Sequence, residues 1–203
     1  MKNFEPWNKG QLVGQKTPLT RSQVWDIRRN LEVKEQWRDL ALFSVAIDTM
    51  LRASDLLALK VGDLVDDDNK PKYQLVTKQQ KTGNAVTVEL SKYARDAIEM
   101  WLKANPKSRF DYIFTGLKGH LNKPISRVQY SKLIKEWVRA IRLPSDDYST
   151  HSLRRTLPAL IYEETQNIEV VRQLLGQSSV QATSHYLNIN QKQSLDIARK
   201  FRI

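Results

Sequence analysis

Cysteine is absent from this chain of 203 residues, which excludes a disulfide framework and a thiolate metal site. Only three histidines are present (His120, His151 and His185), and their spacing is not that of metal ligands, so we expect no metal and no cofactor. No apolar run approaches the ~20 residues that a membrane helix needs, and the N-terminus has no signal-peptide pattern. These absences predict a cytoplasmic protein without a membrane partner.

Acidic residues are outnumbered, since 22 Asp and Glu face 33 Lys and Arg, which gives a net charge of +11. A basic surface attracts polyanions through counterion release, so this excess favours DNA or RNA as a partner over a generally basic protein. From Lys118 to Arg142 the only acidic residue is Glu136. A solvated basic face is the ordinary interpretation of such a stretch.

Apolar residues recur mostly at helical spacing, and they alternate in two short segments. Thr20 followed by Gln23 is a capping-box start for a short helix, and further helices are predicted over 35–51, 91–103 and 126–143. The segments 73–77 and 85–90 are strand-like and flank a polar turn. The pattern predicts an α+β, mainly α-helical fold with a small antiparallel β-hairpin.

A set of polar residues near the C-terminus has the composition of a phosphate site. His151 and Arg154 are three positions apart and project from one face of a helix. Gly176 follows an apolar run, where a helix end favours glycine, and Tyr186 comes on a further short helix. A positive pair, a tight turn with polar side chains and a tyrosine suit phosphate chemistry.

The ordered set His-x-x-Arg, Leu-Gly-Gln-Ser-Ser and Tyr-Leu resembles the C-terminal signature of the tyrosine recombinases, the phage integrase family. Gln177 stands where that family usually has His or Trp. The segment Leu51-Arg52-Ala53-Ser54-Asp55-Leu56 is similar to the family's first box, which makes Arg52 the first catalytic arginine. Asp55 could then orient Arg52 by a charge-assisted hydrogen bond.

The resemblance also implies a catalytic lysine in the hairpin turn, where the family has a Lys-Thr-Gly context. Lys81 matches, and Lys78 is its rival. By itself, Arg52 or Lys81 would more often be a solvated surface cation, and it is the joint match that favours the catalytic interpretation. Pro158 sits within the helix expected after His151, so we expect a kink there or a helix that begins near it.

The implied reaction cuts and rejoins DNA through a 3′-phosphotyrosine, with Tyr186 as the nucleophile. Arg52 and Arg154 would clamp the nonbridging oxygens, and Lys81 would protonate the departing 5′-oxygen. His151 would assist as general base or hydrogen-bond partner, and Gln177 would donate a hydrogen bond to the phosphate. The resemblance also favours backbone contacts with double-stranded DNA by Lys132, Lys135, Arg139 and Arg155.

The resemblance divides the chain into an N-terminal arm (1–17), a catalytic domain (18–189) and a C-terminal helix (190–203). The chain leaves no room for the further N-terminal helical domain of larger members, so it resembles short single-domain members such as the fimbrial phase-switch invertases. Family members act as tetramers on DNA, and we expect the C-terminal helix to dock in trans, although it could also fold back on its own domain.

Two alternative functions stay open at this point. A DNA-binding regulator or accessory protein could keep the fold with weak catalysis, which Gln177 and Pro158 would favour. A type IB topoisomerase shares the chemistry but relaxes supercoils without exchanging partners. The integration, excision or inversion of DNA by a site-specific recombinase is the leading hypothesis.

Overall fold

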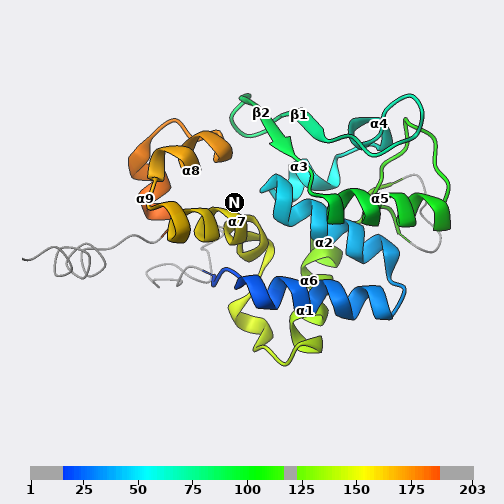
Figure 1. Cartoon of the computed structure of the whole chain (residues 1–203), viewed down its shortest axis with the longest axis horizontal. Helices are drawn as coiled ribbons and strands as arrows, with labels where there is room; N and C mark the ends of the chain where they lie inside the picture. Colours follow the sequence, from blue (N-terminus) through cyan, green and yellow to red (C-terminus); the bar gives the residue numbers. More distant parts are fainter. Residues whose placement is uncertain (1–15, 117–122, 188–203) are drawn as a thin grey trace, which may run out of the picture.

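The computed structural model describes residues 16–116 and 123–187 of the chain (Figure 1). Most of the expected arm (1–17) and the whole expected C-terminal helix (190–203) lie outside these residues. The elements of the described part are α1 Arg21–Val33, α2 Trp37–Thr49, α3 Ala53–Leu57, α4 Val61–Leu64, β1 Gln74–Lys78, β2 Ala85–Glu89, α5 Lys92–Ala104, α6 Arg127–Ala140, the 3₁₀ turn η1 Ser145–Asp147, α7 Thr150–Thr165, α8 Ile168–Leu175 and α9 Val180–Leu187.

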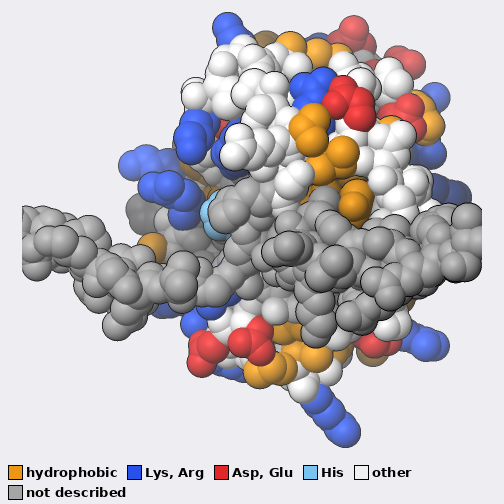
Figure 2. Space-filling view, turned by 90° about the vertical axis from the view of Figure 1, so that its left-hand side faces the viewer, with side chains coloured by type: hydrophobic (Ala, Val, Ile, Leu, Met, Phe, Trp, Pro, Cys, Tyr) orange, Lys and Arg blue, Asp and Glu red, His pale blue; other side chains and the backbone are white. Residues whose placement is uncertain are grey.

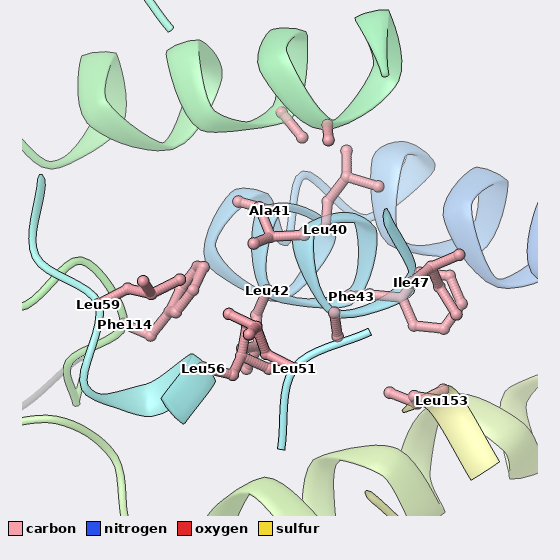
Figure 3. Packing of buried hydrophobic residues seen from close by; sticks show 14 of the residues in the cluster. Leu40, Ala41, Leu42, Phe43, Ile47, Leu51, Leu56, Leu59, Phe114 and Leu153 are labelled. Carbon is pink, nitrogen blue, oxygen red and sulfur yellow. The ribbon is translucent and has the colours of Figure 1, made fainter. Parts of the chain in front are cut away.

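Helix α2 is the centre of the core because it is buried on nearly every side. It packs against α1, α5 and α7, and its apolar side chains meet those of the segments that follow it. Figure 3 shows Leu42 next to Leu51 and Leu56, and Leu153 of α7 on the lower side of the same cluster. Burial of these side chains fixes the start of α7 relative to the end of α2.

Several helices begin at the polar residues that the sequence indicates. The Thr20 side chain accepts from the backbone N–H of Gln23 and completes the predicted capping box of α1. Ser91 and Ser126 accept in the same way at the starts of α5 and α6. Each side chain satisfies a backbone donor that the first helical turn leaves unpaired, which is why helices begin at these positions.

The two strands form the predicted antiparallel hairpin, with Gln74 opposite Glu89 and Lys78 opposite Ala85. Leu75, Val86 and Val88 point inward, while their neighbours along each strand are exposed or half-buried. Figure 1 shows this hairpin beyond one end of α2, on the side toward α8. The fold is therefore mainly α-helical, with one two-stranded antiparallel sheet in the described residues.

A buried ion pair on α2 is hydrogen-bonded to α6. Arg38 and Asp39 are 6% and 7% exposed, and the Arg38 Nε donates to Asp39 Oδ1 at 2.8 Å. The indole Nε1 of Trp137 donates to the other carboxylate oxygen at 3.2 Å, while an Arg38 Nη donates to the Thr115 carbonyl. The carboxylate thus has a partner on each oxygen, which offsets the cost of burying its charge.

Helix α7 runs through Pro158 without ending there, so the expectation of a helix start near this residue is wrong. The helix begins at Thr150, with Ser149 and Ser152 forming a capping box. Thr156 anchors the helix further, because its hydroxyl accepts from the backbone N–H of Leu19 at 3.0 Å and donates to the Ser152 carbonyl. These contacts hold the first turns in place although proline lacks an N–H donor.

No helix in residues 16–116 or 123–187 has both the length and the apolarity to cross a bilayer.

Candidate active site

Arg52 is delivered by the turn that ends α2. Met50 caps that helix in the left-handed conformation (φ 52°), and Arg52 then becomes the N-cap of α3. The half-buried guanidinium donates to Gln79 Oε1 in the hairpin. The hydrogen bond expected from Asp55 is wrong: this carboxylate, 4% exposed, instead accepts from the backbone N–H of Gln80 at 3.1 Å and so holds the hairpin turn.

Gln79 is a functional candidate that the sequence analysis missed. It is 2% exposed, and its amide accepts from Arg52 and from Thr82 and donates to the carbonyl of Leu175 at 3.0 Å. A glutamine before a polar turn is an ordinary solvated residue in most sequences. Only the long-range contact with the end of α8, which local pattern does not report, distinguishes it.

The hairpin turn carries both candidate lysines. Gly83 adopts a positive φ of 70° and donates its N–H to the Gln79 carbonyl, which closes the turn. Lys81 lies exposed within this turn, and Lys78 lies exposed at the end of β1. Both lysines are therefore exposed near the hairpin turn, and the choice of Lys81 over Lys78 stays a prediction.

Helix α7 presents His151 and Arg154 from its first turns. The N–H of His151 is held by the cap at Ser149, and the side chain is exposed. Arg154 is 4% exposed, and one of its Nη atoms is buried without a hydrogen-bond partner among the described residues. A buried guanidinium with an unused donor is costly unless an anion pairs with it.

The charges of these groups act on one another. Desolvation, followed by the positive charges of Arg154, Arg155 and Arg52, lowers the pKa of His151 below its ordinary value of 6.5. Burial also lowers the pKa of Arg154, and Arg52 adds to that effect. The positive charges of Arg52 and Arg154 thus repel each other and disfavour a charged His151, which favours an anion between them.

Gly176 and Gln177 form the tight turn between α8 and α9. Gly176 caps α8 with φ 62°, and its Cα lies against the hairpin: a Cβ there would be 2.6 Å from Val86 Cγ1. The Gln177 carbonyl accepts from Arg172, and its side-chain oxygen accepts from the buried hydroxyl of Thr183 at 2.6 Å. The single proton of that hydroxyl has a second acceptor in the Ser179 carbonyl at 3.1 Å, and a Gln177 amide with its oxygen toward Thr183 has its NH₂ end as the donor for another group.

Tyr186 lies on α9 beneath two arginines. The guanidinium carbons of Arg154 and Arg155 lie 6.0 Å and 5.8 Å from its ring centroid. Its hydroxyl is buried and has no hydrogen-bond partner among the described residues. Burial raises the pKa of Tyr186 to about 12, although the charges of Arg154, Arg155 and Arg52 oppose that rise. The motif order thus corresponds to proximity: Tyr186 is next to Arg154.

The predicted DNA-contact residues lie in two different places. Arg155 is not a surface residue, because it is 8% exposed and donates to the Lys16 carbonyl at 2.7 Å beside the Tyr186 ring. On α6, Lys132 is exposed, Lys135 pairs with Asp146 at 3.1 Å, and Arg139 donates to Ser145. These three remain candidates for a DNA backbone contact outside the tyrosine site.

Figure 2 views the molecule from the side on which α8 and α9 lie in Figure 1. Lysine and arginine side chains gather on one part of this face, next to a histidine side chain. Among the described residues, no three His, Asp or Glu side chains are grouped as ligands of a metal ion. A phenol beside guanidinium groups can attack an anionic ester, because those groups stabilise negative charge on the oxygens.

The sequence profile of the Phage integrase family matches residues 18–193. A probable integrase/recombinase of Bacillus subtilis strain 168, YoeC, is 29% identical over 83% of this chain and 87% of its own length. The tyrosine recombinase XerC of Corynebacterium efficiens is 26% identical over 80% of this chain, but this chain spans only 50% of it.

The fold is also found among solved structures. The crystal structure of the site-specific recombinase XerH bound to its difH substrate, in a pre-cleavage complex, superimposes with a TM-score of 0.68. Its sequence identity is 16%, and the match covers 98% of this chain and 58% of XerH. At this identity the likeness establishes the fold of the chain.

Proposed function

Because the chain belongs to the phage integrase family, we propose that it is a tyrosine-type site-specific recombinase that cuts and rejoins double-stranded DNA. The observation that carries this proposal is the position of Tyr186, whose ring lies beneath Arg154 and Arg155 on the helix that follows the Gly176 turn. The XerH complex supports DNA as the substrate, and a cytoplasmic setting is part of the proposal.

In the proposed reaction the Tyr186 oxygen attacks phosphorus, and the bond to the 5′-oxygen of the next nucleotide breaks. Arg52 and Arg154 bind the nonbridging oxygens, because guanidinium groups match the geometry of a phosphate. The proton of the tyrosine passes to His151 or through it to solvent, since the lowered pKa of His151 leaves that imidazole neutral near pH 7. The NH₂ end of Gln177 donates to the same phosphate.

The leaving 5′-oxygen needs a proton, and we propose that Lys81 of the hairpin turn donates this proton. The new 3′-phosphotyrosine has nearly the energy of the bond it replaces, so a second 5′-hydroxyl can reverse the step without metal or ATP. We extend the proposal to a tetramer on DNA, with residues 190–203 docking on a neighbouring subunit and Lys132, Lys135 and Arg139 contacting DNA.

A covalent-trapping experiment tests the proposal although the target site is unknown. The protein is incubated with a pool of duplexes that have a random central segment and a nick, because the short fragment released beyond the nick diffuses away and the adduct cannot reverse. Sequencing of the DNA in denaturant-resistant adducts identifies the site. Wild-type protein should give adducts, and Tyr186→Phe should bind the recovered duplex without forming them.

Three results would count against the proposal. Binding without an adduct from wild-type protein would favour the accessory DNA-binding function, and an adduct that persists in Tyr186→Phe would assign another nucleophile. Site-independent relaxation of supercoiled plasmid would favour the topoisomerase instead.

A recovered duplex that has sulfur in place of the leaving 5′-oxygen tests the role of Lys81. A thiolate leaves without a proton, so the sulfur-substituted duplex should restore cleavage by Lys81→Ala. The Lys78→Ala variant should cleave the ordinary duplex and need no such restoration.

A further inference from the structure

One buried amide connects three segments that the proposed reaction uses. Gln79 is 2% exposed, and its side-chain oxygen receives the Arg52 guanidinium and, at 3.2 Å, the Thr82 hydroxyl. Its side-chain nitrogen donates to the Leu175 carbonyl at 3.0 Å. Arg52 follows α2, Thr82 is next to Lys81 in the hairpin turn, and Leu175 ends α8 directly before the Gly176 turn.

The two ends of this amide cannot be exchanged. The oxygen end faces the Arg52 guanidinium, which can only donate, and the nitrogen end faces the Leu175 carbonyl, which can only accept, so a flipped amide would lose both of these bonds and leave buried groups unpaired. The orientation of Gln79 is therefore fixed, and it fixes one Nη of Arg52 in turn. A guanidinium carries five N–H donors, so the others stay available for a phosphate.

Further contacts keep the hairpin against the end of α8. The Asn84 side chain donates to the Gly176 carbonyl at 3.2 Å, and the missing Cβ of Gly176 leaves just enough room for Val86 and for the Gln79 amide. Because the Gln79 side chain links the hairpin to the end of α8, a shift of either segment changes the position of the acceptor that Arg52 uses.

We propose that Gln79 is a positioning residue, which sets the direction of the Arg52 guanidinium and makes it depend on the docking of the hairpin against α8. This inference rests on the proposed function and deepens it. Gln79 does not itself touch the phosphate: it acts through Arg52. Engagement of the turn that bears Lys81 and correct placement of Arg52 then occur together.

The cleavage arm of the test uses single-turnover adduct formation on the recovered duplex. Gln79→Met keeps the length of the side chain but removes acceptor and donor, and it should slow cleavage about 10- to 100-fold, the range for losing a hydrogen bond to a charged group. Gln79→Glu keeps an acceptor for Arg52 and should be faster than Gln79→Met. Gln80→Met, at the exposed neighbouring side chain, is the matched control and should match wild type.

The decisive comparison is a double-mutant cycle with Arg52→Ala. If Gln79 acts through Arg52, adding Gln79→Met to Arg52→Ala should slow cleavage less than about twofold further. A role limited to stability would instead give the full 10- to 100-fold loss in both backgrounds, and that result would overturn the proposal.

A second arm needs no DNA. In wild-type protein the Arg52 guanidinium should show separate Nη–H signals by NMR, because the bond to Gln79 hinders rotation, and these should average in Gln79→Met but not in Gln80→Met. Averaged signals in the wild type would refute the positioning role whatever the activity. Separate signals together with no wild-type adduct would instead refute the proposed function and the catalytic part of this inference with it.

Discussion

Replacement of Gly176 by alanine tests whether the hairpin is pressed against the end of α8 as described. Gly176 has φ 62°, and an added Cβ would meet Val86 Cγ1 at 2.6 Å and the Gln79 Nε2 at 3.1 Å. A left-handed conformation costs a non-glycine residue about 1–2 kcal/mol. Overpacking against a neighbour that cannot move freely adds about 1–3 kcal/mol. The expected loss of unfolding free energy is thus about 2–5 kcal/mol.

Gly83→Ala is the matched control because it also places alanine in a left-handed conformation, but its added Cβ does not overpack a neighbour. Gly83 has φ 70°, but its added Cβ would have open space, with Lys78 Cε the nearest atom at 3.9 Å. We expect this variant to lose about 1–2 kcal/mol. The difference between the two variants then isolates the contact between the hairpin and the α8 turn.

Thermal and urea unfolding of both variants provide the measurement. For a chain of this size about 1 kcal/mol shifts the melting temperature by roughly 2–4 °C, so Gly176→Ala should melt roughly 4–20 °C below wild type and Gly83→Ala roughly 2–8 °C below it. Equal destabilisation of the two variants would refute the close packing of Gly176 against Val86. Gly176→Ala should also slow cleavage more than its stability alone explains, since it displaces the Gln79 amide.

Three further predictions concern the site and its surroundings. Thr183→Val removes the hydroxyl that holds the Gln177 amide, so it should slow adduct formation about 2- to 13-fold, the range for one neutral hydrogen bond, while Thr183→Ser should retain activity. Equal loss in both variants would contradict the role of that bond. The imidazole of His151 should titrate below pH 6.5 by NMR and move upward in Arg52→Gln. Because the pKa of His151 is lowered in the folded state, its contribution to the unfolding free energy should decrease as the pH falls through 6.5 toward the folded pKa. An unchanged titration midpoint of His151 in Arg52→Gln would show that Arg52 does not lower this pKa. The logarithm of the DNA affinity should fall with the logarithm of the salt concentration, with a slope of about 0.9 per phosphate contact. That slope should become shallower when Lys132, Lys135 and Arg139 of α6 are replaced by alanine. An unchanged slope would place the DNA on another face.

Local signals in the sequence were sufficient for most elements and for the family. The capping box at Thr20, the serines before α5 and α6, the alternating strands and the glycine after α8 each act within a few residues, so their outcome can be read locally. The order of the motifs likewise predicted that Tyr186 lies on a helix near Arg154, and in the structure the Arg154 guanidinium lies over the Tyr186 ring.

What the sequence left open depends on contacts between distant segments. The expected partner of Arg52 was Asp55, three positions away, but the hairpin supplies Gln79 instead, and Asp55 holds that hairpin. Arg155 looked like an exposed cation beside Arg154, yet the chain near Lys16 covers it. Pro158 suggested a helix boundary, but tertiary anchoring of α7 at Thr156 overrides it. The assignment of Lys81 stays a prediction.

The buried pair of Arg38 and Asp39 has a consequence for the direction of the basic residues on α6. Apolar contacts alone, such as the edge-on packing of Phe43 and Trp137 at 5.6 Å, would tolerate some sliding and rolling of α6 on α2. The Trp137 indole, however, must reach an Asp39 oxygen. Since each residue turns a helix by about 100°, a one-residue change of register would leave a buried carboxylate oxygen without that donor. The hydrogen bond from Trp137 to this ion pair therefore fixes the rotation of α6 about its own axis. That rotation sets the direction in which Lys132, Lys135 and Arg139 project from the helix.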